Sequence, residues 1–321
     1  MRNSPIRIIA LDGGTTNTRL TLVADGVILD RKKLSCGIRD GKEALVLGLS
    51  REIPLFLSEN GLAGNDITAI TASGMVTSEL GLYTVPHIVT PVGAKELSER
   101  SVMADLPEIC DIPFRFVPGV KTFDSAENLL ADMDIMRGEE TETVAILDRM
   151  GLFDEKNVTL ILPGSHMKVV VCNRGKIVHF VTTLSGELTR AAAENTILKN
   201  SVGDAFFREL SLEHLYLGYK TAEALGMGAA LFKVRVEGNF AGADKKQLYS
   251  VLLGAVLYDD IDMIVKNSKG TVVVGGSDPF RSAYLELLSG RVKNILEVPE
   301  ELAENAAAYG VWTVTEQLYS V

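Results

Sequence analysis

The first thirty residues follow a plan that restricts the chain to few folds. An apolar stretch at 6–11 indicates a strand, a second strand spans 20–23, and a third covers 27–29 after the turn at Gly26. The connection between the first two strands reads DGGTTNT at residues 12–18. An acid, two glycines and a run of hydroxyl and amide side chains are typical of a turn whose free N–H groups bind phosphate. An ordinary hairpin turn is the alternative interpretation.

This turn supplies the first set of candidate site residues. We expect its backbone to approach a ligand closely and its side chains to add neutral donors. The candidate phosphate-binding residues are Gly13, Gly14, Thr15, Thr16 and Asn17. Asp12, at the end of the first strand, is suited to hold Mg²⁺ through water, because a carboxylate without a cation would repel phosphate. A magnesium ion therefore belongs to the predicted site.

A second passage, at residues 158–183, repeats the plan of strand, Gly-containing polar turn, strand, Gly turn and strand. Gly14-Thr15 and Gly164-Ser165 fall at matching points, which indicates an internal duplication. Two halves with one phosphate turn each predict two domains, at residues 1–142 and 143–321, with a cleft between them. The alternative is that any α/β protein contains several strand-turn-strand units.

The two turns differ in charge. Asp12 has only Leu162 as its counterpart, whereas the second turn supplies His166 and Lys168. An acid for the metal on one side and a base for phosphate on the other are expected of a phosphoryl-transfer site. We expect Lys168 to spread the charge that develops on the transferred group. The second set of nucleotide-binding candidates is Gly164, Ser165 and His166.

Length and charge exclude several classes of protein. A chain of 321 residues with 46% hydrophobic residues is long enough for two domains with separate cores. The net charge of −10 argues against a surface for nucleic acid or anionic membrane. The start of the chain lacks the apolar core of a signal peptide, and no later run approaches a membrane span, so we expect a cytoplasmic protein. A homodimer is the default oligomer.

Helical periodicity dominates the second half of the chain. It predicts helices over residues 186–200, 203–217, 221–236, 245–266 and 279–288, and an earlier one over 43–58. The helix predicted over 279–288 follows an apolar strand, TVVV, through the sequence GGSDP. Gly275 and Gly276 would let an adenine ring lie against backbone, and a tight strand-to-helix turn is the alternative.

An acidic motif, RGEETE at residues 137–142, lies before the second phosphate turn. A kinase that acts on a sugar-like hydroxyl needs a carboxylate to orient or deprotonate that hydroxyl, and Glu139 and Glu140 are the candidates. Arg137 is a candidate for binding an acidic substrate. Helix initiation would also explain the glutamates, because acids complement the dipole at a helix N-terminus.

A second acidic motif, TTLSGELTRAAAE at residues 182–194, lies where a strand becomes a helix. Glu187 and Arg190 are candidates for substrate contact. The alternative is an N-terminal helix cap formed by Ser185 or Thr183.

These passages together resemble a known family. DGGTTNTR resembles the first phosphate motif of the actin, sugar-kinase and heat-shock-chaperone ATPase superfamily, whose two ribonuclease-H-like domains close over ATP. MRGEETE, LPGSHMK, TTLSGEL and SGMVTSELG are similar to the 2-dehydro-3-deoxygalactonokinase family, and the similarity covers most of the chain. The resemblance implies an α/β fold and ATP-dependent phosphorylation of the 6-hydroxyl of 2-dehydro-3-deoxy-D-galactonate, a step of galactonate catabolism. A small-molecule sugar acid is then the partner.

Three positions depart from the family pattern. Gly13 and Val169 stand where the family usually carries Trp, and Glu142 stands where Gln is usual. We expect the Glu142 side chain to point away from the cleft. One alternative is a kinase of the same superfamily with another sugar acid or small hydroxyl substrate. A second is a binding or regulatory protein that uses ATP without phosphorylating a small molecule. The sequence alone leaves open which of Glu139 and Glu140 is the base.

Overall fold

The structure is a computed structural model that describes residues 5–14, 16–125, 127–203 and 207–319. The chain forms two compact units. Unit 1 comprises the described residues up to Asp154, the segment 173–179 and the described residues from Glu304 onward. Unit 2 comprises residues 155–172 and the described residues of 180–303. The expected domain boundary between 142 and 143 falls inside α3 (Glu139–Arg149), and this helix belongs whole to unit 1.

The main sheet of unit 1 has six strands in the order β3-β2-β1-β4-β7-β6. The three predicted strands are confirmed as an antiparallel meander, and β4 then pairs parallel with β1. The strands are β1 (Arg7–Gly13), β2 (Thr18–Ala24), β3 (Val27–Leu34), β4 (Ala69–Gly74), β6 (Val102–Ala104) and β7 (Phe114–Phe116).

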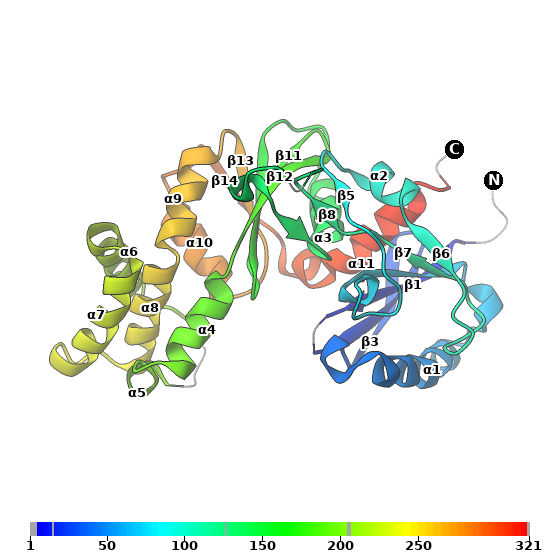
Figure 1. Cartoon of the computed structure of the whole chain (residues 1–321), viewed down its shortest axis with the longest axis horizontal. Helices are drawn as coiled ribbons and strands as arrows, with labels where there is room; N and C mark the ends of the chain where they lie inside the picture. Colours follow the sequence, from blue (N-terminus) through cyan, green and yellow to red (C-terminus); the bar gives the residue numbers. More distant parts are fainter. Residues whose placement is uncertain (1–4, 15, 126, 204–206, 320–321) are drawn as a thin grey trace. The chain divides into compact units, whose positions relative to one another are not determined.

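Two helices cover opposite faces of this sheet. Alternate residues of a strand point to opposite faces. Ile9 and Leu11 of β1 belong to the core under α1 (Lys42–Glu59), while Ile8 and Ala10 pack with Trp312 of α11 (Glu300–Glu316). Figure 1 shows α1 and α11 on the two sides of the sheet. The C-terminal helix was not among the predicted elements, and it closes the core of unit 1.

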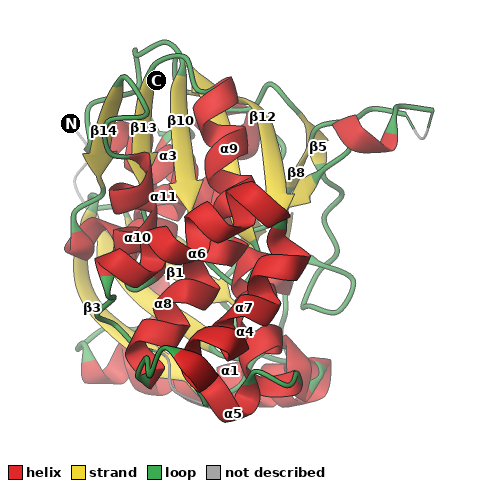
Figure 2. Cartoon of the chain, turned by 90° about the vertical axis from the view of Figure 1, so that its left-hand side faces the viewer, coloured by secondary structure: helices red, strands yellow, loops and turns green. Residues whose placement is uncertain are grey.

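A five-stranded sheet in the order β12-β11-β10-β13-β14 belongs mainly to unit 2, and residues 176–179 of β12 lie in unit 1. Figure 2 shows β10, β13 and β14 side by side. β10 pairs antiparallel with β11 and parallel with β13, as β1 does with β2 and β4. This repeated topology is that of the two predicted ribonuclease-H-like domains. The strands are β10 (Val158–Leu162), β11 (Met167–Asn173), β12 (Lys176–Thr183), β13 (Thr271–Val274) and β14 (Asn294–Glu297).

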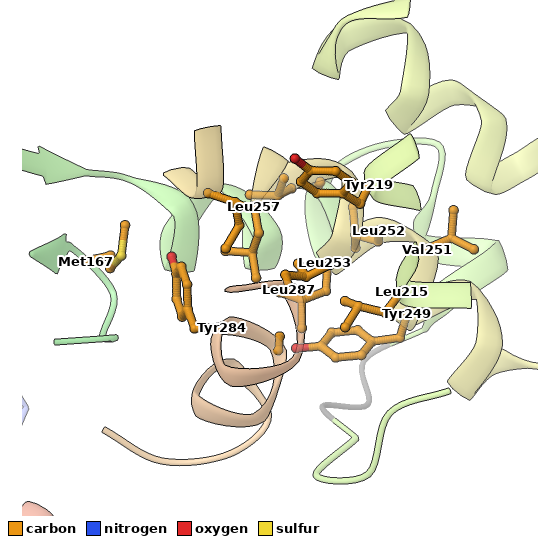
Figure 3. Packing of buried hydrophobic residues seen from close by; sticks show 14 of the residues in the cluster. Met167, Leu215, Tyr219, Tyr249, Val251, Leu252, Leu253, Leu257, Tyr284 and Leu287 are labelled. Atoms are coloured by element: carbon orange, nitrogen blue, oxygen red, sulfur yellow. The ribbon is translucent and has the colours of Figure 1, made fainter. Parts of the chain in front are cut away.

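A layer of helices covers the sheet of unit 2 and encloses its largest core. Tyr249, Leu252 and Leu253 of α8 pack with Tyr284 of α10 and Met167 of β11 (Figure 3). Each such buried side chain contributes about 1.5–3 kcal/mol of hydrophobic free energy. The helices are α4 (Ser185–Asn195), α5 (Lys199–Val202), α6 (Leu212–Leu225), α7 (Met227–Phe240), α8 (Lys245–Val256), α9 (Tyr258–Asn267) and α10 (Phe280–Leu288).

The break between α6 and α7 lies later than the sequence predicts. The prediction placed it at residues 218–220, but α6 continues through Gly218. A Cβ at Gly218 would lie 2.0 Å from the carbonyl oxygen of Val251, so this glycine allows α6 and α8 to approach closely. Gly226, with φ of 80°, ends α6, because a left-handed backbone does not continue a helix.

The remaining elements of unit 1 are short. They include η3 (Met75–Thr77), α2 (Ala94–Glu99) and a three-stranded sheet of β5 (Ile88–Val89), β8 (Val120–Lys121) and β9 (Ile135–Met136). Among the described residues, no helix combines the length and apolar character needed to cross a membrane.

Candidate active site

The first predicted phosphate turn connects β1 to β2. The N–H of Gly14 donates to the carbonyl of Asn17 at 3.0 Å and closes the turn, and Thr16 is exposed. A Cβ on Gly13 would lie 2.0 Å from Cγ1 of Val76 in η3, so no larger residue fits at position 13. Packing against η3 thus explains the glycine where Trp was expected. Thr15 lies outside the described residues.

Asp12 ends β1 and lies directly opposite Arg19 of β2. Nη1 of Arg19 and Oδ2 of Asp12 are 3.2 Å apart, and the Asp12 side chain is 28% exposed. Burial raises the pKa of Asp12, and Arg19 opposes this rise. Sequence reasoning assigned no role to Arg19, although the hairpin register would have paired it with Asp12.

The loop after β4 lies against the end of β1. Gly74 has φ of 77°, and a Cβ there would lie 3.0 Å from the carbonyl oxygen of Gly13 and 3.4 Å from Oδ1 of Asp12. Gly138, which precedes α3, also lies close to Gly74, because a Cβ added at Gly138 would lie 3.4 Å from the Gly74 Cα. The ends of β1 and β4 and the start of α3 therefore meet in unit 1.

The first turn of α3 carries the two candidate base residues. The Glu140 carboxylate accepts the N–H of Gly138 at 2.9 and 2.8 Å, and the side chain of Glu139 accepts the N–H of Arg137 at 3.2 Å. These bonds satisfy N–H groups that precede the helix. Glu140 is fully buried, and burial together with Glu139 raises its pKa to about 8, whereas Glu139 is half-buried.

The expectation that the Glu142 side chain points away from the cleft stays a prediction. Burial, together with the charges of Glu139 and Asp12, raises the pKa of Glu142 to about 8. Glu142 is the fourth residue of α3 and follows Glu139 by three, which places both on one side of the helix. The carboxyl of Glu142 thus feels the charges of both Glu139 and Asp12.

Arg137 connects α3 to the segment after β4. Its Nη1 donates to the carbonyl of Thr77 at 2.8 Å, and its Nη2 donates to the carbonyl of Val85 at 2.8 Å and lies 3.2 Å from Nδ1 of His87. Burial and the nearby Arg137 lower the pKa of His87 to about 4. The guanidinium therefore ties the SGMVTSELG segment to the start of α3.

The second predicted phosphate turn connects β10 to β11 in unit 2. Lys168 follows it on β11 and is only 5% exposed. Its ammonium donates to the hydroxyl of Thr182 on β12 at 2.7 Å. This bond links the two motifs LPGSHMK and TTLSGEL.

The start of α4 packs directly on the second turn. The N–H of Glu187 donates to the carbonyl of Ser165 at 3.0 Å, and Nε2 of His166 lies 3.3 Å from Oε1 of Glu187. A Cβ on Gly186 would lie 2.0 Å from the carbonyl oxygen of Gly164. Unit 2 therefore brings its two predicted motifs into one cluster, and Arg190 lies one turn further along α4, paired with Glu194.

A buried carboxyl anchors the start of α4. The hydroxyls of Ser185 and Tyr284 both donate to Oδ2 of Asp260 on α9, and Thr183 lies 2.9 Å from Ser185. Burial raises the pKa of Asp260, and these hydroxyls oppose the rise. The cap interpretation of Ser185 and Thr183 is wrong, because the N-cap position is Leu184 and no side chain caps the helix.

The GGSDP segment also reaches the second turn. The N–H of Gly275 donates to the carbonyl of Ile161 at 2.9 Å, and a Cβ on Gly276 would lie 2.9 Å from Cδ of Pro163. Gly276 has φ of 73°, as a tight strand-to-helix turn requires. Both glycines thus border the turn that carries Gly164.

The metal prediction rests on a small donor set. Within the described residues, no group of three or more His, Cys, Asp or Glu side chains is arranged to hold a metal ion. Carboxylate oxygen is nevertheless the ligand type that Mg²⁺ takes, usually one or two per ion, with water and phosphate completing the shell. The carboxyl of Asp12 fits that chemistry, because burial raises its pKa and a bound cation would favour its charged form.

Comparison with known proteins gives consistent matches. The profile of the 2-keto-3-deoxy-galactonokinase family matches residues 12–314. A Rhizobium meliloti (strain 1021) protein assigned as 2-dehydro-3-deoxygalactonokinase DgoK1 is 25% identical over 314 residues, covering 94% of this chain and 97% of that protein. The Escherichia coli (strain K12) 2-dehydro-3-deoxygalactonokinase is 25% identical over 287 residues, covering 84% and 86%.

A solved structure agrees on the fold. The crystal structure of a Sinorhizobium meliloti protein assigned as a 2-dehydro-3-deoxygalactonokinase matches with a TM-score of 0.79 at 22% identity, covering 98% of this chain and 100% of the other. The family profile begins at Asp12 and extends through both phosphate turns, α3 and α4. The chain therefore belongs to the 2-keto-3-deoxy-galactonokinase family, a family of kinases.

Proposed function

We propose that this kinase uses ATP to phosphorylate the 6-hydroxyl of 2-dehydro-3-deoxy-D-galactonate in galactonate catabolism. The observation that carries the proposal is the family match over residues 12–314, which spans every motif assigned to the site. The relatives are named for this substrate, and the clustered acids of unit 1 and the polar turn of unit 2 support phosphoryl transfer.

The nucleotide is assigned to the two phosphate turns. The turn that begins at Gly13 in unit 1 and the turn at Gly164 to His166 in unit 2 are each assigned to phosphate, and Gly275 and Gly276 of unit 2 are assigned to the adenosine. The carboxylate of Asp12 would hold Mg²⁺, which supplies charge neutralisation for the phosphates when bound. Release of Arg19 from Asp12 frees that carboxylate for this purpose.

Glu139 is assigned as the group that orients or deprotonates the attacking hydroxyl. Glu140 is fully buried, and both its oxygens accept the N–H of Gly138, so it has no surface for a substrate. Glu139 is half-buried at the same helix end, and its charge acts on the carboxyl of Glu142. Proximity of a base to the hydroxyl contributes about 10²–10⁴-fold in rate.

The cationic groups of the site take separate roles. Lys168 stabilises the charge of the transferred group, since it is held at the second turn by Thr182. Arg190 and Glu187 of α4 bind the sugar acid. Arg137 acts through the segment that it ties to α3, because its terminal nitrogens already bond to Thr77 and Val85.

A coupled ADP-release assay tests the proposal. Mg·ATP is supplied with 2-dehydro-3-deoxy-D-galactonate, with its gluconate epimer, with other sugar acids and without acceptor. Turnover with the galactonate compound and none with its epimer is the expected result. Turnover with only another acid overturns the substrate assignment while retaining the kinase, and ADP release without acceptor overturns the kinase assignment itself.

A further inference from the structure

A buried hydroxyl lies beside the proposed metal ligand in unit 1. Ser73 is the fifth residue of β4, and the parallel register of β1 and β4 places it directly opposite Asp12. Its side chain is fully buried, and among the described residues its hydroxyl has no hydrogen-bond partner. Such a hydroxyl has lost its hydrogen bonds to water and has gained none in the protein, which costs free energy. An unpartnered group of this kind at the end of two strands indicates a functional role.

Ser73 and Asp12 point to the same face of the sheet. The hydroxyl of Thr71 in β4 lies 3.2 Å from that of Thr315 in α11, so Thr71 points to the α11 side. Side chains alternate along a strand, so Ser73, two residues further on, points to that side too. Asp12 follows Ala10, which belongs to the core on the α11 side, by two residues. Neighbouring strands are about 4.8 Å apart, which a serine and an aspartate side chain can bridge with one hydrogen bond.

The two oxygens of the Asp12 carboxylate face different strands. Oδ2 lies 3.2 Å from Nη1 of Arg19 on β2. Oδ1 lies on the side of β4, because a Cβ added at Gly74 would be 3.4 Å from it. Within the part of the chain that the structure describes, Oδ1 accepts no hydrogen bond. The carboxylate therefore has a donor on its β2 side, and on its β4 side it has an oxygen without a donor next to Ser73.

A neutral donor suits a carboxylate that binds a cation. Arg19 carries a charge of the same sign as Mg²⁺, so the two compete for Asp12. A hydroxyl has no net charge, and it can donate to one carboxylate oxygen while the other oxygen binds a cation. Donors of this kind orient the carboxylate ligands of metal ions, and their removal commonly lowers metal affinity about 10–100-fold. Ser73 supplies such a donor on the strand next to Asp12.

We propose that Ser73 is a positioning residue for Asp12, and that its hydroxyl donates to Oδ1 when the Asp12 carboxylate binds Mg²⁺. The inference rests on the metal role of Asp12 in the proposed function. It assigns a role to the first residue of the SGMVTSELG motif, which the proposed function leaves without one. Because Ser73 acts through the metal ligand, it should affect nucleotide binding only when a divalent cation is present.

The test measures ADP affinity by calorimetric titration of the full chain, once with excess Mg²⁺ and once with EDTA. Ser73→Ala should weaken binding of Mg·ADP about tenfold or more, and it should leave binding of ADP in EDTA within about twofold of the original protein. In the Asp12→Asn background the same substitution should have no further effect on Mg·ADP affinity, because the interacting pair is already broken.

Urea unfolding without nucleotide or metal gives a second readout. Ser73→Ala should have a midpoint equal to or above that of the original protein, because it removes a buried hydroxyl that lacks a partner. Ser98→Ala is the matched control. Ser98 on α2 also carries a buried hydroxyl without a partner among the described residues, and α2 supplies no residue of the candidate site. Ser98→Ala should change the midpoint similarly and should bind ADP within about twofold of the original protein in both conditions.

The outcomes separate the inference from the proposed function. If Asp12→Asn binds Mg·ADP as tightly as the original protein, the metal role of Asp12 fails, and the role of Ser73 fails with it. If Asp12→Asn weakens Mg·ADP binding and Ser73→Ala does not, only the role of Ser73 is overturned. A loss of affinity in Ser73→Ala that persists in EDTA also overturns it. A midpoint of Ser73→Ala clearly below that of Ser98→Ala does so as well, because the hydroxyl would then have a structural partner.

Discussion

The two phosphate turns of this protein share a backbone plan and differ in what holds and surrounds them. In unit 1 the turn follows Asp12, whose partner is the exposed Arg19, and its glycine packs on a side chain of η3. In unit 2 the turn is covered by the start of α4, and Lys168 is buried beside it. The duplicated topology therefore preserved a shape, while the charges diverged into an acidic and a basic half.

The acids of the two units show the same contrast. In unit 1 the charges of Asp12 and Glu139 each act on Glu142, so the charged form of Glu142 is disfavoured. Asp260 in unit 2 is buried too, but hydroxyl groups of Ser185 and Tyr284 donate to it. A carboxyl with its own donors is a structural anchor, whereas clustered carboxyls without enough donors favour a cation. The comparison therefore favours Asp12 over Asp260 as the proposed metal ligand.

Exchange of the two acids for amides gives the largest expected effect. Asp12→Asn should lower turnover roughly a thousandfold, because it removes a charge proposed to hold the cation. The urea midpoint of this variant should change little. Asp260→Asn should instead lower the free energy of unfolding by about 1–3 kcal/mol through its hydroxyl partners. Steady-state turnover and urea unfolding measured on both variants separate the two roles.

Near-normal turnover of Asp12→Asn would contradict the metal assignment. An unchanged midpoint for Asp260→Asn would show that the network around Ser185 does not anchor α4.

Alanine at the matching glycines should give the next largest effect. Gly13→Ala places a Cβ 2.0 Å from Val76, and overpacking of this kind costs about 1–3 kcal/mol. Gly164→Ala places its Cβ 3.5 Å from the carbonyl oxygen of His166, which is an ordinary contact. We expect a lower melting temperature for the first variant and little change for the second, as measured by thermal unfolding. Equal shifts would show that the two turns are equally constrained.

The sequence predicted the parts of this comparison that depend on local pattern. The meander in unit 1, the repeat at residues 158–183 and the helix over 43–58 follow from period and turn chemistry, and the structure confirms them. Packing between distant segments is not encoded in such patterns. The return of α11 to the first sheet and the anchoring of Ser185 by Asp260 were therefore missed.

The candidate site shows the same limit. Glu139, Glu140 and Lys168 were selected by residue type, but which carboxyl is accessible depends on a hydrogen bond from Gly138 that no spacing rule reveals. The raised pKa of Glu142 was not predicted, for a related reason: burial and the effect of Asp12 depend on how α3 packs against β1, which is a tertiary property. Hairpin register, by contrast, was available from the sequence and would have paired Asp12 with Arg19.

A smaller effect tests the crowding of acids in unit 1. The pKa of Glu142 rises from 4.5 in the unfolded chain to about 8 in the folded protein. Between these values the folded state holds a proton that the unfolded state has lost, so stability falls as pH rises. Glu142→Gln removes this penalty, and its stability relative to the original protein should increase by about 1 kcal/mol or more from pH 5 to pH 8. Urea unfolding at several pH values measures the difference.

Glu43→Gln, at an exposed glutamate in the first turn of α1, is the matched control for removal of one carboxyl from a helix start. If the stability difference of Glu142→Gln varies with pH no more than that of Glu43→Gln, the Glu142 carboxyl is not crowded by Asp12 and Glu139.

The smallest expected effect separates structure from function in the second turn. His166 and Glu187 approach within 3.3 Å, but their side chains are 52% and 57% exposed. Exposed ion pairs contribute about 0–1 kcal/mol, so His166→Gln should change the free energy of unfolding by less than about 0.5 kcal/mol. If His166 contacts the nucleotide as proposed, the same variant should raise the KM for ATP several-fold with the fold unchanged. An unchanged KM for ATP would mean that His166 is a surface residue without a role in nucleotide binding, and Lys168 would be the remaining basic residue of the second turn. A large loss of stability would mean that the second turn depends on the His166–Glu187 pair as the first turn depends on Gly13.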